Sequence, residues 1–447
     1  MKKLIAIFKN KDIRDRILFT LGIVLIFRIG ASISVPGVTI SQDAMDTTDV
    51  LALMNLMGGG ALQNFSLFAL GVSPYITSSI IIQLLSMDVL PVLTDLSKQG
   101  QSGRKKIEMA TRYLTLLLGA VQAYGITVTM ENSDSITLAD SSFWGHMEIA
   151  IFLIAGSMLV MWMADQITTK GIGNGISMII FIGIVAALPM QIYSAFEYFF
   201  ATTLPTGDQG LILNGAVQMI LYILAYLLII LFVAFIEKSV RKIPVQHSNK
   251  GGALNAKVNN TSFLPIKINS AGVIPVIFAS SLLMAPAVIV SFAVEDTNAT
   301  INNILNIFST SALVEMPWFN GETWYMPWGL IIYIVLTFAF SFFYSNLTIN
   351  PERLSDDFQK NGSYIPGIRP GNETRRYISK VLNRITFIGA TALTLIAALP
   401  IVLTLAGVVP SSLALGGTGM IIIVGVALET MKQIDGLLAS NEHADVI

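Results

Sequence analysis

The sequence predicts an all-α polytopic membrane protein with ten transmembrane helices. Of its 447 residues, 53% are hydrophobic and only 12% are charged, whereas soluble domains are about 25% charged. The mean hydropathy is +0.69, and ten apolar runs approach the roughly 20 residues that one membrane helix needs. This composition excludes a soluble globular protein, a disordered chain and a secreted disulfide scaffold.

The first run follows the basic start MKKLIAIFKNKDIRDR. No small-residue cleavage site follows it, so we expect a retained helix rather than a signal peptide. The last two runs come from one uncharged stretch that is too long for a single span, and Pro400 and Pro410 break it. The ten predicted spans are Ile17–Ser34, Pro74–Leu90, Tyr113–Met130, Ile149–Ala164, Ile176–Phe196, Leu211–Ile236, Ala271–Val294, Tyr325–Ile349, Ile385–Leu405 and Val409–Leu428.

Basic residues fix the expected orientation. With the N-terminus inside, all 27 Lys and Arg residues except the mid-span Arg28 fall on the inner side. The outer side carries acids such as Asp43, Glu131 and Glu295. Inner loops of membrane proteins are enriched in Lys and Arg. The sequence therefore predicts that both termini lie inside.

Two inner loops, residues 237–270 and 350–384, are longer than topology alone requires. Both are basic and rich in Gly, Pro and Asn. One interpretation is a pair of solvated segments that only set the orientation. The other, which their length favours, is a docking platform for a cytosolic partner.

The segment GGGALQNFSLFALG, from Gly58 to Gly71, lies on the outer side between the first two spans. Its apolar part is too short to cross a membrane and is typical of a re-entrant or interfacial piece. Irregular backbone at membrane depth is tolerated only inside protein or beside a water-filled cavity. The pattern alone leaves two alternatives open, an ordinary outer loop or a piece folded into a pore.

Glycine clusters open the fifth and tenth spans from opposite faces, at Gly171–Gly175 and Gly416–Gly419. They indicate weakly a pair of inverted repeats, each of five spans, while close helix packing explains them as well. A phosphate-binding loop is excluded because no Gly-Lys-Ser/Thr follows. Ionisable residues within the spans are scarce, which favours a passive conduit or one driven by an outside motor.

Seven long motifs resemble the SecY family of protein-conducting channels, in order and over nearly the whole chain. The longest are GGGALQNFSLFALGVSPYITSSIIIQLL, MWMADQITTKGIGNGISMIIFIGIVAALP and NPERLSDDFQKNGSYIPGIRPG. The others are FRIG with the later PG, GQSGRKKIEMATRY, LPIKINSAGVIPVIFASS and GGTGMII. The resemblance implies two pseudo-symmetric halves, residues 17–203 and 204–436, around a central pore, with residues 1–16 and 437–447 cytoplasmic.

The resemblance also assigns residues to the pore. It makes residues 58–71 a short re-entrant plug helix, with Gly58, Gly59, Gly60, Ala61, Phe65, Leu67, Phe68 and Gly71 as its candidate residues. It carries the family's central constriction onto six aliphatic positions, Val72, Ile76, Ile176, Ile180, Ile277 and Ile422. A narrow aliphatic ring offers ions no hydrogen bonds and blocks them by dewetting.

A lateral gate is implied between the second and third spans and the seventh and eighth. Its candidate residues are Thr77, Gln83, Asn269 and Ala285. The resemblance places motor or ribosome docking on the inner loops, at Arg241, Lys242, Lys250, Pro366, Gly367, Arg369, Pro370 and Gly371. The sequence departs from the family at residues 247–261, where Asn, Gly and Ala replace basic residues and weaken the expected contact.

The resemblance implies a non-enzymatic pore subunit in a bacterial plasma membrane. It would move unfolded polypeptides across the membrane and release hydrophobic segments sideways into lipid. The implied partners are the SecE and SecG subunits, the SecA motor, the ribosome, signal peptides, nascent membrane proteins and the lipid bilayer. No cofactor, metal or direct nucleic-acid specificity is expected. The alternatives are a specialised accessory paralogue, a secondary transporter with a charged midplane site, and a scaffold without a pore.

Overall fold

The computed structural model describes residues 9–40, 58–86, 90–132, 135–200, 209–247, 262–293, 306–310, 312–317, 323–407 and 416–444. Each of the ten predicted spans overlaps one described helix. These helices are α2 (Lys11–Ala31), α4 (Ser73–Leu85), α6 (Gln101–Asn132), α7 (Phe143–Lys170), α8 (Gly175–Phe200), α9 (Gln209–Lys238), α10 (Ile274–Ala293), α12 (Trp328–Thr348), α14 (Asn372–Leu405) and α16 (Gly416–Ala444).

Within the described residues, six of these helices are long and apolar enough to cross a membrane by length and composition, namely α6, α7, α8, α9, α12 and α14. Helix α4 and the first part of α10 are shorter apolar helices. The 34 residues of α14 rise about 51 Å at 1.5 Å per residue, which exceeds a hydrocarbon core of about 30 Å. Its charged first turns therefore extend beyond the apolar run predicted to begin at Ile385.

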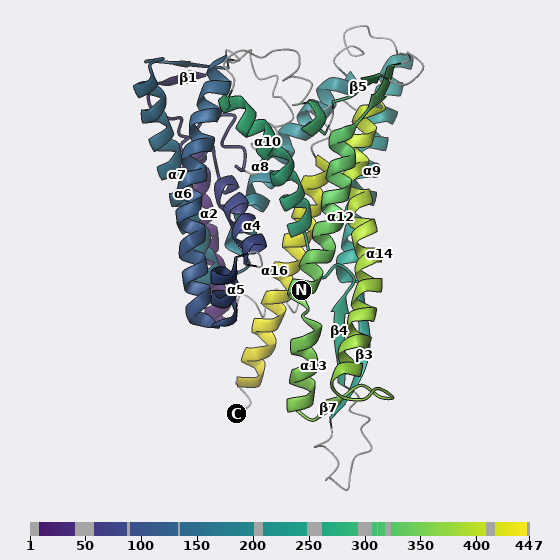
Figure 1. The fold of residues 1–447 in the computed structure, drawn as a ribbon. Helices are drawn as coiled ribbons and strands as arrows, with labels where there is room; N and C mark the ends of the chain where they lie inside the picture. The colour runs from purple at the N-terminus through teal and green to yellow at the C-terminus, as the bar shows by residue number, and fades with distance from the viewer. Residues whose placement is uncertain are drawn as a thin grey trace.

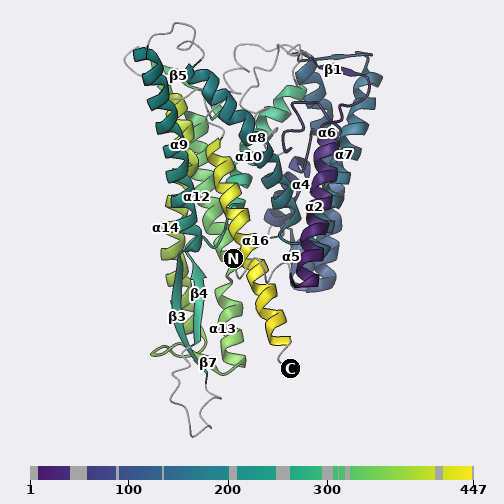
Figure 2. The same cartoon turned by 180° about the vertical axis from the view of Figure 1, so that it is seen from behind.

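The helices form two groups (Figure 1). Helices α2, α4, α6 and α7 lie on one side, α9, α12 and α14 on the other, and α8, α10 and α16 between them. Helix α6 packs against α4 and α7, α12 packs against α10 and α14, and α16 packs against α8 and α9. The view from behind shows α16 between the same two groups (Figure 2). Helix α10 packs against α12 and also reaches α4 and α6, so the two groups meet along it. The line of contact at α4, α10 and α12 is called the seam below.

Short strands mark the two ends of the molecule (Figure 1). At one end β1 (Val38–Ile40) pairs antiparallel with β2 (Ile136–Leu138), and β5 (Val314–Pro317) pairs with β6 (Thr323–Met326). At the other end β3 (Val240–His247), β4 (Ser262–Lys267) and β7 (Ser363–Tyr364) form one sheet in the order β4-β3-β7.

That sheet joins the two inner loops that the sequence singled out. Strands β3 and β4 come from the first loop, and β7 comes from the second, where it follows the short helix α13 (Pro351–Lys360). The register pairs Gln246 with Tyr364 and His247 with Ser363. The platform is therefore one structure built from both loops rather than two separate segments.

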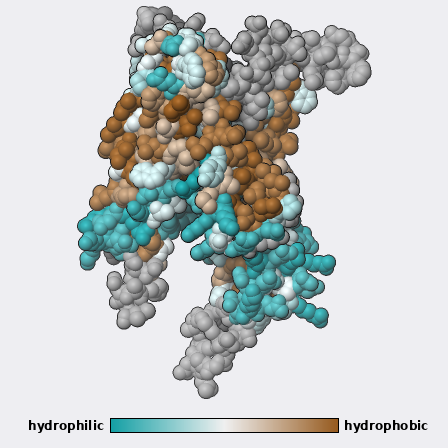
Figure 3. All heavy atoms as spheres, turned by 60° about the vertical axis from the view of Figure 1, so that its left-hand side comes forward, coloured by the Kyte–Doolittle hydropathy of each residue, from teal (hydrophilic) through white to brown (hydrophobic). Residues whose placement is uncertain are grey.

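The surface fits a membrane between these ends. Figure 3 shows a broad hydrophobic band across the helices and hydrophilic residues gathered at the end that carries β3, β4 and α13. On α9, Leu228, Leu231 and Phe235 are 57%, 65% and 71% exposed. Such apolar exposure on a long helix is typical of a surface that faces lipid, and the chain is a multi-pass membrane protein.

The predicted orientation can be tested with single cysteines, because the chain has none of its own. Ala139, next to β2, and Asn361, after α13, are both exposed and lie at opposite ends. We expect a membrane-impermeant thiol reagent outside intact cells to label Ala139→Cys and to spare Asn361→Cys until the membrane is permeabilised. The reverse labelling would contradict the inward orientation of the termini.

Candidate functional site

The predicted plug segment lies inside the protein but is not a helix. Residues 58–72 form consecutive turns, where the sequence predicted a short re-entrant helix. The backbone explains the difference, because Gly59, Gly60, Phe65 and Gly71 all have positive φ angles. A right-handed helix cannot pass through such residues. The expectation of a helix at 58–71 was therefore wrong, while the expectation of a buried segment is confirmed for Ala61, Phe65 and Phe68.

Polar contacts tie the segment to the first group of helices. The mid-span Arg28 of α2 donates from Nη1 to the Gly59 carbonyl at 2.9 Å. At the other end, Ser157 of α7 donates its hydroxyl to the Gly71 carbonyl at 2.9 Å. The Val35 N–H donates to the Phe65 carbonyl at 3.0 Å. The Arg28 guanidinium is thus paired with a backbone carbonyl, and charged groups within membrane spans need such a partner.

Close packing against α2, α7 and α8 also holds the plug segment in place. The rings of Phe27 and Phe68 stack with centroids 5.7 Å apart. A Cβ atom at Gly183 of α8 would overlap the Cα of Gly59, and one at Gly156 of α7 would overlap the Leu67 carbonyl. Glycines on the surrounding helices therefore let the segment approach their backbones directly.

We expect Gly183→Ala to displace the start of the plug segment. The added methyl group meets backbone rather than a flexible side chain, and overpacking of this kind costs about 1–3 kcal/mol. The expected result is increased ion leakage through the resting protein in a planar bilayer. Gly22→Ala is the matched control, because a Cβ there meets nothing within 4 Å. Equal, unchanged leakage in both variants would show that the segment does not depend on this contact.

The six predicted ring residues come from four separate elements. Val72 and Ile76 lie at the start of α4, Ile176 and Ile180 in α8, Ile277 in α10 and Ile422 in α16. Five belong to one continuous cluster of buried apolar residues, and Ile176 is partly buried against it. The buried core therefore joins α4 of the first group with α8, α10 and α16, which lie between the groups. The role of the six residues as a constriction stays a prediction.

Gln83 makes a direct polar contact across the seam, with Tyr344 of α12. The Tyr344 hydroxyl of α12 donates to Gln83 Oε1 of α4 at 2.6 Å. The Tyr344 ring lies edge-on to Phe278 of α10, with centroids 4.9 Å apart. Thr77 instead donates to the Ser73 carbonyl of its own helix. The structure thus places Gln83 at the seam with a partner, Tyr344, that the sequence reasoning did not name.

The other two predicted gate residues differ. Asn269 lies just before α10, and its amide bonds Glu237 and the Gly272 carbonyl rather than α4. Its expected position in the gate lining therefore does not match its contacts. Ala285 lies within α10, but its side chain lies outside what the structure describes.

The predicted docking residues lie on the three-stranded sheet and its neighbouring turn. Arg241 and Lys242 are exposed on β3 opposite Ile266 and Pro265 of β4. Lys250 lies outside the described residues. The sheet rests on a small apolar cluster of its own, formed by Ile243, Ile266, Ile365, Ile378, Leu382 and Ile385.

Buried Ile365 fixes the turn that presents Arg369. Pro366, Gly367, Arg369 and Pro370 are exposed, and Gly371 is half-buried. The Thr374 hydroxyl donates to the Arg369 carbonyl at 2.9 Å, and the Ser355 hydroxyl of α13 donates to the Gly371 carbonyl at 2.8 Å. The turn is therefore held from behind while its basic tip faces outward.

Comparison with known proteins identifies the fold and its family. The SecY family model matches residues 66–431. The chain is 40% identical over 446 residues to the protein translocase subunit SecY of Lactococcus lactis subsp. cremoris, covering 99% of this chain and 97% of that protein. The chain belongs to the SecY family.

Other relatives agree with this assignment. The protein translocase subunit SecY of Bacillus subtilis strain 168 is 41% identical over 434 residues, covering 97% and 96% of the two chains. A solved structure described as that of a protein conducting channel has a TM-score of 0.66 at 16% identity, covering 94% of this chain and 91% of its own. Sec61 in a canine ribosome-channel complex has a TM-score of 0.63 at 15% identity with the same coverage. These structures share the SecY fold.

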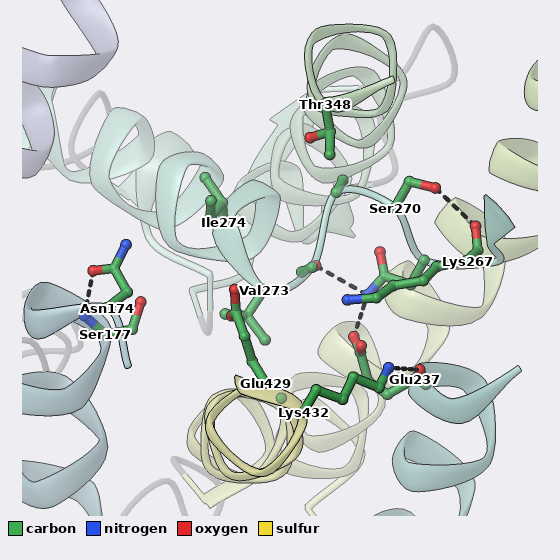
Figure 4. A pocket seen from close by; sticks show the side chains of 14 residues that line it. Asn174, Ser177, Glu237, Lys267, Ser270, Val273, Ile274, Thr348, Glu429 and Lys432 are labelled. Carbon is green, nitrogen blue, oxygen red and sulfur yellow. Dashed lines mark hydrogen bonds between the residues drawn. The ribbon is translucent and has the colours of Figure 1, made fainter. Parts of the chain in front are cut away.

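One feature of this SecY-family chain escaped the sequence reasoning. A cavity of about 190 Å³ opens between α8, α10 and α16, and Asn174, Ser177, Glu429 and Lys432 are among its lining residues. Figure 4 shows Glu237, Lys267 and Lys432 together on one side of it, with Asn174 and Ser177 on the other side. Burial lowers the pKa of the Lys432 ammonium group, and the nearby Lys267 lowers it further. The sequence feature that could have pointed to this cavity is an acid, Glu237, at the end of α9, which is the most apolar of the six candidate membrane spans.

Proposed function

We propose that this SecY-family chain is the pore-forming subunit of a protein translocase that conducts unfolded polypeptides across a membrane. The observation that carries the proposal is the placement of the plug segment. Residues 58–71 enter the helical body from one end and pack against α2, α7 and α8, directly before the aliphatic positions Val72 and Ile76.

The aliphatic positions and the plug segment would act in series at rest. β-Branched side chains are stiff at χ1 and fill a narrow opening with a defined shape. They offer no hydrogen bonds to water or ions, so a narrow ring of them dewets. A passing polypeptide finds no strong partner there, which allows it to move on once the plug segment leaves its seat.

Sideways release would use the seam at α4, α10 and α12. The Tyr344–Gln83 hydrogen bond spans this seam, and a bond between buried polar side chains of membrane helices contributes only about 0.6 kcal/mol on average. A hydrophobic segment that inserts between the helices can replace such a contact at low cost. This is the expected route for signal peptides and membrane-spanning segments into lipid.

We place the sheet β4-β3-β7 and the turn around Arg369 in the cytoplasm of a bacterial cell, with both termini on that side. The exposed basic residues there suit an acidic face of SecA or the phosphate backbone of a ribosome. SecE and SecG are the proposed membrane partners. ATP hydrolysis belongs to the motor in this proposal, and the chain itself performs no chemical step.

Purified protein reconstituted into vesicles with its partner subunits tests this function. With SecA and ATP, an unfolded precursor carrying a signal peptide should become protected from added protease. A precursor whose signal has lost its hydrophobic core is the matched control. If neither precursor becomes protected while the reconstituted complex is intact, the proposal fails.

A further inference from the structure

The connection that leads into α10 is held by the segment between α9 and β3 and by the helices α14 and α16. Residues 268–273 link β4 to the first turn of α10. The Ile268 N–H donates to the carbonyl of Ser239, between α9 and β3, at 3.0 Å. On the opposite sides, Gly389 of α14 approaches the Ile268 carbonyl and Gly425 of α16 approaches the Val273 side chain so closely that neither position has room for a Cβ.

Asn269 makes the central contact of this connection. Its Nδ2 donates to Glu237 Oε1 of α9 at 2.6 Å and to the Gly272 carbonyl at 3.0 Å. Both side chains are buried, with Asn269 5% exposed and Glu237 7% exposed. An amide nitrogen has two N–H groups, and both are used here. The two bonds fix the direction in which the chain leaves the connection and enters α10.

Helix α16 closes the cluster from the other side. Lys432 Nζ donates to the backbone carbonyl of Glu237 at 3.3 Å. Figure 4 shows this bond at Glu237, with Glu429 and Lys432 both projecting from α16. The start of α10 is thus positioned by contacts with α9 and α16 together.

We propose that Glu237 and Asn269 are positioning residues that set the resting place of α10, and through it the closed seam between α4 and α10. In the part of the chain that the structure describes, hydrogen bonds join these two residues to each other, to Gly272 and to Lys432. Helix α10 packs against α4, α6 and α12, so a change in its start is carried to the seam. The effect on sideways release rests on the proposed function. The effect on the position of α10 does not, so the two can fail separately.

Spin labels measure the position of α10 without any translocation. Trp162 on α7 and Leu282 on α10 are both exposed and apolar, and cysteines introduced there can be labelled specifically because the chain has no others. We expect Glu237→Ala to shift or broaden the distance distribution by about 2 Å, the scale of helix shifts at packed interfaces. Glu237→Gln keeps an oxygen acceptor for the Asn269 amide and should leave the distribution unchanged.

Asn269→Ala should reproduce the shift of Glu237→Ala, and the double variant should add little, because each single change removes the same bond. Asn269→Ala also serves as the test if Glu237→Ala does not assemble. Ser270→Ala is the control, since that hydroxyl bonds only the nearby Lys267 carbonyl. In translocation, the two alanine variants should accept a precursor with a weakened signal about tenfold better, the scale of one hydrogen bond to a charged group.

An unchanged distance distribution in both alanine variants would overturn the proposal, whatever the translocation assay reports. An equally large shift with Glu237→Gln and with Glu237→Ala would also overturn it. The charge of Glu237, and not its hydrogen bond to Asn269, would then hold α10. A shift in distance without any change in signal selectivity would keep the positioning role of Glu237 and Asn269 and contradict its coupling to the seam.

Discussion

Replacing Ile76 and Ile277 together with Asn is expected to make the resting protein conduct ions. Both side chains are buried, 4% and 6% exposed, in the same apolar cluster. An amide buried there without a partner costs about 1–3 kcal/mol, so water that satisfies it is drawn into the opening. A hydrated opening admits ions where an aliphatic one excludes them. The measurement is the conductance of a planar bilayer containing the purified complex and no polypeptide substrate.

The matched control is Ile76→Leu with Ile277→Leu, which keeps the volume and the apolar character. It should leave the bilayer closed. Closed bilayers with both double variants would mean either that these two positions do not line the narrowest point or that the plug segment seals the protein alone. Adding Gly183→Ala to the Asn variant separates these two cases, since it loosens the seat of the plug segment.

We expect Arg369→Glu to abolish transport driven by the motor while leaving the protein assembled. Arg369 is exposed on a turn whose backbone is held by Thr374, Ser355 and the buried Ile365, so the substitution changes charge without disturbing the fold. Like-charge contact at an interface costs several kcal/mol, which is a loss of at least about two orders of magnitude in affinity. The measurements are SecA binding to vesicles and protected precursor in the translocation assay.

Lys105→Glu provides the control for that charge reversal. Lys105 is also exposed and basic, but it lies near the start of α6 and away from the three-stranded sheet. It should retain most of the binding. Normal motor binding and transport by Arg369→Glu, or an equal loss in the two variants, would remove the specific role assigned to the turn.

Hydrophobic pattern and charge carried most of the fold prediction. Ten apolar runs became ten helices because a run of about 20 apolar residues has few other ways to satisfy its backbone in lipid. The lengths were less predictable, as α6 and α14 continue through charged residues that pack outside the apolar layer. The joining of the two inner loops depends on the β3–β7 register, a long-range pairing that no local pattern indicates.

The candidate site was predictable in part, for physical reasons that differ between residues. Backbone with positive φ turned the expected plug helix into turns, and Phe65 gives no hint of such a conformation in the sequence. Gln83 lies at the seam, but its partner Tyr344 is 261 positions away. The family resemblance placed Asn269 in the lining of the gate, while in the structure its amide donates to Glu237.

The most direct test of the account is to ask what touches a polypeptide halfway through the protein. A photoreactive residue at Ile180, buried on α8, is compared with one at Leu228, exposed on α9, in vesicles that hold an arrested precursor. We expect crosslinks from position 180 to the precursor and none from position 228. Two results would contradict a path through the centre of the helical body. One is crosslinks from position 228 alone, and the other is an arrested precursor with no crosslink from position 180.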